Sequence, residues 1–252
     1  MINCAKVIAC YFGERRDSNN NPNDVLGFVN LVIENEINID NGYPTDVILA
    51  VNNCGNPELD GALAKYNNLP TKNGKIIVFN RDNYGASFGC YFDSFYQYKN
   101  DYTHWFFCED DVLIHKDQYM KSFVDFFESN KDTVSFVSLA PISDYTINSS
   151  SSKMHSGGGC GLTSTQWMSY VYTKDSIIND ILPAHRESIN SYGYFENLEI
   201  EFTGRLNVEG KVLKNHPDFN CLCDNYTKHS SQFPYSIKSV DELEFIYTVG
   251  NK

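Results

Sequence analysis

With 252 residues, the chain is long enough to form one large domain, or two small ones, around a proper core. Hydrophobic residues make up 42% of it and aromatic residues 14%, a composition that excludes an intrinsically disordered chain. The formal net charge of −12 argues against a nucleic-acid partner, because phosphate backbones are bound by clustered Lys and Arg.

The N-terminal sequence and the cysteines indicate in which cellular compartment the protein is expected. No signal peptide is expected, because the opening MINCAKVIACYF has no cleavage-type ending, and no apolar stretch approaches the roughly 18 residues of a membrane span. Peripheral membrane contact stays open. The eight cysteines form no C-x-x-C pair, and Cys10, Cys90 and Cys108 stand in apolar contexts. We therefore expect reduced core cysteines and a cytoplasmic protein.

Short apolar runs alternate with amphipathic segments through the first half of the chain. Buried strands are predicted at 4–11, 45–53, 75–80 and 102–108, and helices at 24–37, from Pro57 onward, and at 86–98. The first helix has apolar residues at the i, i+3, i+4, i+7 and i+8 spacing of one face, with Asn23 or Asp24 as its N-cap. A helix at 118–128 and a fifth strand at 133–140 follow.

The composition changes to Ser, Asn and Gly at 141–161, which predicts a long loop or a subdomain boundary. Beyond it the pattern predicts a strand at 165–173, helices around 176–182 and 195–208, and a last apolar run at 243–249. The alternation as a whole predicts an α/β fold, with a mostly parallel central sheet flanked by helices. Such sheets bind ligands outside the carboxyl ends of their strands.

Three consecutive acids, Glu109, Asp110 and Asp111, follow the fourth predicted strand and precede the apolar run Val112–Ile114. Burying such carboxylates unpaired would cost several kcal/mol each, so a nearby cation is expected. Oxygen ligands suit Mg²⁺ or Mn²⁺, which keep several waters and are completed by substrate phosphates. Asp111 is the predicted metal ligand, supported by Glu109 and Asp110 through water or ribose. A solvated turn at the strand end is the alternative.

A second charged cluster, ENLEIEFTGRLNVEG, spans 196–210. On a helix Glu201 and Arg205 would form an i, i+4 pair, so the cluster taken alone is equally compatible with an ordinary charged helix face.

The two clusters in this order resemble the nucleotide-diphospho-sugar transferases of the GT-A fold. In these, an aspartate-rich strand end (the D-x-D motif) holds a divalent metal against the donor diphosphate. EDD followed by aliphatic residues is similar to the form in N-acetylglucosaminyltransferases of this fold. E-I-E-F-T-G-R-L-N-V-E-G is similar to the E-D-x-E-L-x-x-R-x-x-x-x-G signature of the inverting family 2 glycosyltransferases, with Arg205 and Gly210 at the expected spacing.

This resemblance implies an inverting glycosyltransferase that moves a sugar from a nucleoside diphosphate, a UDP-sugar foremost, to a hydroxyl of a glycan or other acceptor, with Mn²⁺ or Mg²⁺. Residues 1–140 would form the nucleotide-sugar-binding half, and 141–252 the half that binds the acceptor and carries the base. Glu199 stands in the place of the catalytic aspartate, with Glu201 and Glu196 as alternatives, and Leu198 replaces the preceding glutamate.

The resemblance also implies a set of donor contacts. His229 would complete the metal site, with His216 as its competitor and His155 as a weaker candidate for a phosphate contact. The family's acid at the end of the second strand is replaced by Asn52 or Asn53. The remaining predicted nucleotide and donor contacts are Tyr11, Arg15 with Arg16, Arg81, Asp82, Asn83 and Gly85; a solvated loop explains each of them equally well.

Two other functions compete with this interpretation. A nucleotidyltransferase on a related sheet would carry a Gly-rich, basic loop after the first strand, but FGERRDSNN has one glycine. A non-catalytic carbohydrate- or nucleotide-binding module with the same fold is the other alternative, because the base position departs from the family pattern.

Overall fold

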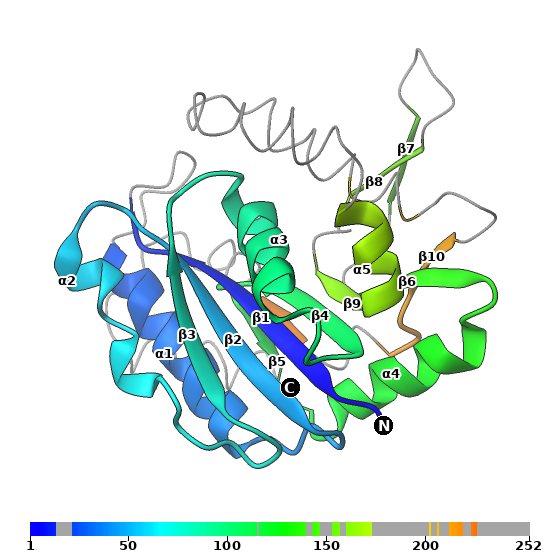
Figure 1. The fold of residues 1–252 in the computed structure, drawn as a ribbon, viewed down its shortest axis with the longest axis horizontal. Helices are drawn as coiled ribbons and strands as arrows, with labels where there is room; N and C mark the ends of the chain where they lie inside the picture. The colour runs from blue at the N-terminus through cyan, green and yellow to red at the C-terminus, as the bar shows by residue number, and fades with distance from the viewer. Residues whose placement is uncertain are drawn as a thin grey trace.

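A seven-stranded sheet forms the centre of the molecule (Figure 1). The computed structural model describes residues 1–13, 22–114, 116–139, 143–146, 153–156, 160–172, 202, 206, 212–218 and 223–225. The strands are β1 (Cys4–Tyr11), β2 (Thr45–Asn52), β3 (Ile76–Arg81), β4 (His104–Glu109), β5 (Val112–Ile114), β6 (Val134–Ser138), β7 (Ser143–Thr146), β8 (Lys153–Ser156), β9 (Gly161–Ser164), β10 (Val212–Asn215) and β11 (Cys223–Asn225). The helices are α1 (Pro22–Asn38), α2 (Pro57–Asp60), the 3₁₀ turn η1 (Ala64–Tyr66), α3 (Ala86–Tyr98), α4 (Tyr119–Asn130) and α5 (Thr165–Tyr172).

The strand order in this sheet is β10-β6-β9-β4-β1-β2-β3. The pairs β1–β2, β1–β4, β2–β3 and β6–β10 are parallel, and only β9, between β4 and β6, runs antiparallel to its neighbours. β1 to β4 therefore end at one edge of the sheet. The predicted α/β class with a mostly parallel sheet is confirmed, and the arrangement is Rossmann-like.

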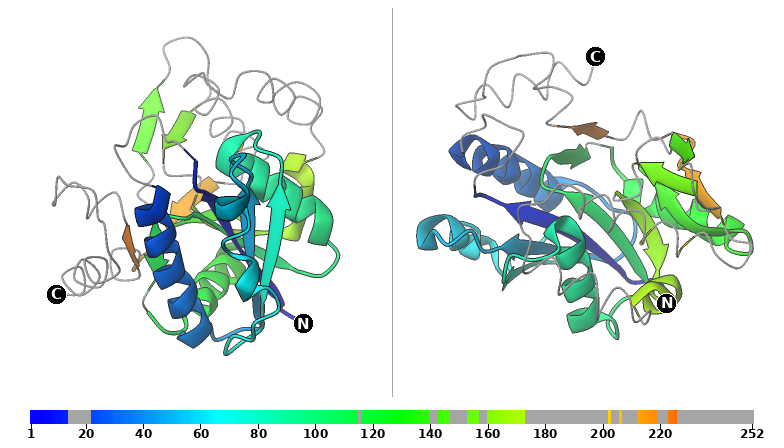
Figure 2. Two further views of the ribbon diagram at one scale, coloured as in Figure 1. Left: turned by 90° about the vertical axis from the view of Figure 1, so that its left-hand side faces the viewer. Right: turned by 90° about the horizontal axis from the view of Figure 1, so that it is seen from above.

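Helices cover both faces of the sheet, with α1 and α3 on opposite sides (Figure 2). α1 buries Val25, Phe28, Val29, Val32 and Ile33, the stripe that the sequence spacing predicted. The helix begins at Pro22, however, so the expected N-cap at Asn23 or Asp24 is wrong. Proline is favoured in the first turn of a helix, because its missing N–H would have no intrahelical partner there.

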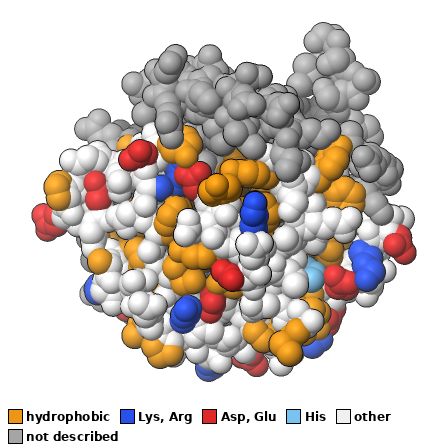
Figure 3. Space-filling view, in the orientation of Figure 1, with side chains coloured by type: hydrophobic (Ala, Val, Ile, Leu, Met, Phe, Trp, Pro, Cys, Tyr) orange, Lys and Arg blue, Asp and Glu red, His pale blue; other side chains and the backbone are white. Residues whose placement is uncertain are grey.

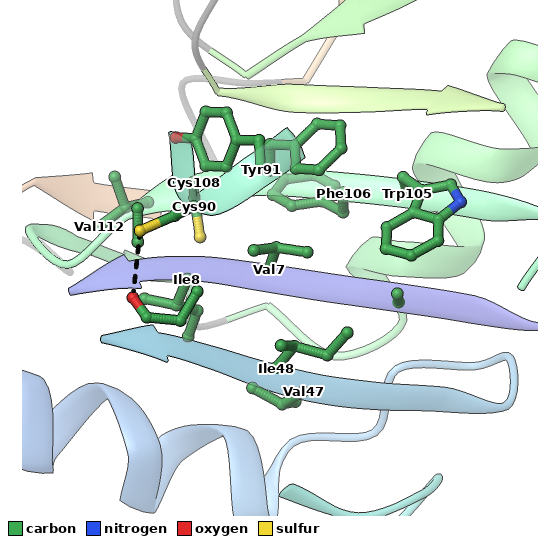
Figure 4. Close-up of a cluster of buried hydrophobic side chains, with 14 of the residues drawn as sticks. Val7, Ile8, Val47, Ile48, Cys90, Tyr91, Trp105, Phe106, Cys108 and Val112 are labelled. Carbon is green, nitrogen blue, oxygen red and sulfur yellow. Dashed lines mark hydrogen bonds between the residues drawn. The ribbon is translucent and has the colours of Figure 1, made fainter. Parts of the chain in front are cut away.

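β4 is buried on both faces, and its side chains alternate between two aromatic layers. Trp105 and Phe107 face α3, with ring centroids 5.1 Å from Phe95 and 4.7 Å from Tyr91. Phe106 points the other way and meets Phe123 of α4 at 5.0 Å. Figure 4 shows Val7 of β1 among the aromatic side chains of α3 and β4. Burial on both faces explains why the strand reads as an unbroken apolar run.

An ion pair lies inside the α1 face of the sheet. Lys6 Nζ of β1 is 2.6 Å from Glu36 Oε1 of α1, and both side chains are fully buried. The Tyr119 hydroxyl donates to Glu36 Oε2 at 3.2 Å, and Lys6 Nζ lies 5.0 Å from the centroid of the Tyr119 ring. A buried charge is tolerated only when it is paired and hydrogen-bonded, and this arrangement provides both.

Two sequence-based predictions in the second half are corrected. The strand expected at 165–173 is helix α5, whose buried residues Trp167, Met168 and Val171 follow the i, i+1, i+4 spacing of a helix face. The Ser- and Gly-rich stretch 141–161 is not only loop, because β7 and β8 pair antiparallel within it. β-Branched and aromatic residues in α5 suggested a strand, and burial of one side of a helix outweighed that propensity.

The rest of the second half is described in part. Phe202 and Leu206 of the helix predicted at 195–208 are helical and fully buried. The predicted helix around 176–182 and the apolar run 243–249 lie outside the described residues. β9 and β10 join the same sheet as β1 to β4, so the described strands of both predicted halves, 1–140 and 141–252, contribute to one sheet.

Cys10, Cys90 and Cys108 are buried and are not joined in disulfides, as their apolar contexts predicted. Among the helices that the structure describes, none combines the length and hydrophobicity that a membrane span requires.

The buried pair predicts a specific stability effect. Lys6→Met would leave the Glu36 carboxylate buried without its cation, and we expect it to destabilise the protein by about 3–5 kcal/mol. Lys6→Met combined with Glu36→Gln removes both charges and should recover most of that loss. Urea denaturation measures the free energies of unfolding. An equal loss in the single and double variants would contradict a charge coupling between the two residues.

Candidate functional site

The carboxyl ends of β1, β2, β3 and β4 bring together polar residues that are far apart in the sequence. Tyr11, Asn52, Arg81 and Glu109 are the last residues of these parallel strands. This edge is where open α/β sheets bind their ligands, and the residues predicted after β1 to β4, which are Tyr11, Asn53, Arg81, Asp82, Asn83, Gly85 and the three acids, lie at it.

The three consecutive acids have different surroundings. Asp110 is 3% exposed, and its Oδ2 accepts the backbone N–H of Tyr11 at 2.9 Å. Glu109 is half-buried and accepts a hydrogen bond from the Ser87 hydroxyl of α3, while Asp111 is half-buried. The acids are therefore not buried as one repelling cluster. Asp110 joins β1 to the β4–β5 turn, which leaves Asp111 and Glu109 as the more accessible carboxylates.

Asn52 and Asn53, at the end of β2, also differ in burial and in hydrogen-bond partners. Asn52 is 3% exposed, accepts from Arg81 through Oδ1 and donates through Nδ2 to the Ala86 carbonyl at 3.2 Å. Asn53 is half-buried, and its Oδ1 lies 3.4 Å from Asn80 Nδ2. Asn53 is therefore the more exposed of the two at this edge, and its contact with a donor stays a prediction.

Arg81 is buried behind the loop that follows β3. Its Nε is 2.7 Å from Asp93 Oδ2 of α3, its Nη1 donates to the Tyr84 carbonyl at 3.0 Å, and its guanidinium stacks on the Tyr84 ring at 4.2 Å. These contacts hold the loop, and a direct contact of Arg81 with a nucleotide stays a prediction. Asp82 is exposed, Asn83 is half-buried and Gly85 has a left-handed φ of 68°, so this loop offers polar groups at the site.

Tyr11 is half-buried, and its ring closely approaches the start of the loop after β1. A Cβ on Gly13 would lie 2.2 Å from the Tyr11 hydroxyl oxygen and 2.9 Å from Cys54 Cβ. Glycine is required there because the Tyr11 ring and the β2–α2 loop occupy the space of a side chain. Stacking of a base on Tyr11 stays a prediction.

Phe202 connects the second sequence cluster to this edge. Its ring centroid lies 5.6 Å from Phe88 of α3 and 6.3 Å from Phe107 of β4. Phe88 follows Ser87, and Phe107 precedes Glu109 by two residues. Phe202, which lies within the second sequence cluster, therefore packs in the same aromatic core as residues next to Ser87 and close to Glu109 in the chain.

His216 has a structural role. It is 2% exposed, its Nδ1 accepts the backbone N–H of Asp218 at 3.1 Å, and its Nε2 lies 3.0 Å from Ser122 Oγ. Its ring stacks on Phe123 at a centroid distance of 4.3 Å. Because both ring nitrogens are engaged, His216 is a poor metal ligand. The other candidates, Arg15, Arg16, Glu196, Glu199, Glu201, His229 and the side chain of His155, lie outside the described residues.

Sequence reasoning missed Asn52 as a structural residue, and also Tyr84, Ser87 and Asp93. Asp93 carried a usable signal, because it is the only charged residue in the aromatic segment of α3.

Within the described ranges, no group of three or more His, Cys, Asp and Glu side chains could hold a metal ion. Asp111 would therefore depend on water, ligand oxygens or residues elsewhere in the chain.

Comparison with protein-family models gives no match to this chain, and no curated protein matches it at a significant level. The resemblance to GT-A transferases therefore stays a prediction.

The close approach of α3 to the β3–α3 loop predicts a position sensitive to substitution. In Gly89→Ala, the new Cβ would lie 2.1 Å from the Tyr84 carbonyl oxygen and 2.7 Å from Arg81 Nη2. The loop would have to move, and we expect a loss of about 1–3 kcal/mol in urea denaturation. In the control Gly61→Ala, the Cβ would meet only the Pro57 carbonyl oxygen at 3.1 Å, and a change within about 0.5 kcal/mol is expected. Similar losses at both positions would contradict this account.

Buried histidines predict a pH-dependent stability. Burial lowers the pKa of His216, and it lowers the pKa of His104 despite the neighbouring Glu128 carboxylate. Below about pH 6.5 the unfolded chain protonates these histidines, while the folded protein does so only at lower pH. The free energy of unfolding should therefore fall from about pH 7 to about pH 5, by at most about 1.4 kcal/mol per pH unit for each histidine.

The matched variant for this effect is His216→Gln, whose amide can still donate to Ser122. Urea denaturation across the same pH range should give a shallower slope for this variant than for the wild type. An unchanged slope would rule out a contribution from His216.

Proposed function

We propose that the protein is a metal-dependent, inverting glycosyltransferase of the GT-A type. Its donor would be a nucleoside diphosphate sugar, a UDP-sugar foremost, and its acceptor a hydroxyl of a glycan or similar molecule. The observation that carries the proposal is the packing of Phe202 against Phe88 and Phe107. It joins the two sequence clusters whose order suggested this family.

Chain connectivity limits how far the candidate bases can lie from Phe202. Glu201 and Glu199 precede the buried Phe202 by one and three residues, and a chain extends at most about 3.6 Å per residue. The Cα atom of Glu199 is therefore within roughly 11 Å of that of Phe202. This distance is compatible with a base acting beside a donor bound at the carboxyl edge.

A divalent cation fits the chemistry of the acids. The half-buried carboxylate of Asp111 is an oxygen ligand of the kind Mn²⁺ and Mg²⁺ prefer, and His229 would be its partner. On the face seen in Figure 3, Lys and Arg side chains lie singly among acidic and uncharged ones over the described residues. A chain of net charge −12 would need either a metal or a local basic pocket to bind a diphosphate, and the acids at the edge favour a metal. When bound, the cation would supply Lewis-acid stabilisation of the departing diphosphate.

The chain's own residues would position the donor and move one proton. Asn53, directly after β2, and Asp82, Asn83 and Gly85, in the loop after β3, would contact the nucleotide and sugar at the edge of the sheet. Glu199 would accept the proton of the acceptor hydroxyl as its oxygen bonds to the anomeric carbon and the bond from that carbon to the diphosphate breaks. Glu201 and Glu196 are the alternative bases.

Metal-dependent nucleotide binding tests the proposal. We expect UDP with Mn²⁺, at about 100 times its Kd, to stabilise the wild type by about 2.7 kcal/mol, which raises Tm by several degrees. Asp111→Asn should remove the Mn²⁺-dependent part of this shift. The control Asp101→Asn makes the same charge change at an exposed site in the turn after α3, and it should behave like the wild type. If no nucleoside diphosphate gives a Mn²⁺-dependent shift in the wild type, the transferase proposal fails.

Turnover separates an enzyme from a binding module. Glu199→Gln should bind UDP with Mn²⁺ normally but lose about 10²–10⁴-fold in the rate of UDP-sugar hydrolysis or transfer. The same loss in Glu201→Gln instead would assign the base to that residue. Nucleotide binding by a wild type without turnover of any UDP- or GDP-sugar would favour the non-catalytic module.

A further inference from the structure

The loop between β3 and α3 has a strained backbone beside the proposed donor site. Gly85 has a φ of 68° and the next residue, Ala86, a φ of 46°. The left-handed region costs a residue with a Cβ about 1–2 kcal/mol, so Ala86 stays there only if its surroundings impose the conformation. Two consecutive left-handed residues reverse the chain and start α3 at this point.

Buried side chains donate hydrogen bonds to the backbone carbonyl groups on either side of this turn. Arg81 Nη1 donates to the Tyr84 carbonyl at 3.0 Å, and Asn52 Nδ2 donates to the Ala86 carbonyl at 3.2 Å. Arg81 also donates to Asn52 Oδ1, so the two side chains form one buried unit. This unit, which we call the loop clamp, holds the carbonyl groups before and after Gly85.

Asp93 holds the loop clamp in place from α3. Its Oδ2 lies 2.7 Å from Arg81 Nε, and the Tyr84 hydroxyl donates to the same carboxylate at 2.8 Å. The Tyr84 ring in turn covers the Arg81 guanidinium at 4.2 Å. An ionised carboxylate that orients a buried guanidinium makes the stronger, charge-assisted class of hydrogen bond. Loss of this carboxylate would therefore loosen the clamp as a whole.

The strained turn also affects the position of the Glu109 side chain, through Ser87. Ser87 directly follows Ala86, and its hydroxyl donates to Glu109 Oε1 at the end of β4. The position of the Ser87 hydroxyl therefore depends on the backbone that the clamp imposes. Asp93, Arg81 and Tyr84 thus act on both sides of the proposed donor site, on the loop with Asp82 and Asn83 and on the first of the three acids.

From these contacts we infer that Asp93 and Tyr84 are positioning residues for donor binding: they fix the β3–α3 loop and Glu109 in the geometry that receives a nucleoside diphosphate. The inference rests on the proposed function, because it assumes that this edge binds such a donor. It adds residues that touch no atom of the donor molecule but influence the affinity of the site for that donor.

A pair of matched variants separates positioning from general stability. Tyr84→Phe removes the hydrogen bond to Asp93 but keeps the ring on Arg81. Tyr102→Phe removes an equivalent bond, from the Tyr102 hydroxyl to Asp46 Oδ2 at 2.8 Å, at the opposite edge of the sheet. Both should lower Tm to a similar extent. Only Tyr84→Phe should weaken binding of UDP with Mn²⁺ in calorimetry, by about threefold to tenfold.

Asp93→Asn provides the second variant and should weaken binding at least as much as Tyr84→Phe. Unchanged Kd values in both variants, with the wild type binding UDP, would overturn the positioning role and leave the proposed function standing. Equal weakening in Tyr84→Phe and Tyr102→Phe would also overturn it, because the effect would then follow stability. If the wild type binds no nucleoside diphosphate, the proposed function itself is contradicted, and the inference that rests on it is contradicted as well.

Discussion

The point at which β4 leaves the sheet sets the geometry of the site. The β1–β4 pairing ends at Ala9 opposite Glu109, while β1 continues to Tyr11 along β2. The Tyr11 N–H therefore needs another acceptor, because an unpaired buried backbone donor costs as much as a lost hydrogen bond. The Asp110 carboxylate provides it at 2.9 Å. One acid of the three is thereby used to close the sheet, and its neighbour Glu109 accepts a hydrogen bond from Ser87 of α3.

Aromatic packing connects this edge with the second half of the chain. Phe202 meets Phe88, Phe92, Phe107 and Phe136, which belong to α3, β4 and β6. A buried Phe contributes on the order of 2–3 kcal/mol through removal of apolar area from water. Burial of the apolar Phe202 side chain thus anchors this part of the second half of the chain against α3, β4 and β6.

Polar residues at the carboxyl edge fall into two groups with different surroundings. Asp110, Asn52 and Arg81 are buried and bond to backbone groups of the neighbouring loops. Asn53 and Asp111 are half-buried. The first group satisfies donors and acceptors that the ends of the strands leave unpaired, as any buried polar group requires. The second group is the more exposed part of the edge, and the first group holds the backbone around it.

The sequence by itself determined the α/β class, the strands β1 to β4, and the stripe of α1, because strand and helix periodicities are local properties of the chain. It also predicted that the three acids stand at the end of β4, whose last residue is Glu109. Only the tertiary structure decided that Asp110 caps β1, that Arg81 pairs with Asp93, and that 165–172 is a helix. These outcomes depend on which distant groups meet when the core is buried, and the identity of a residue does not specify its partner across the sheet.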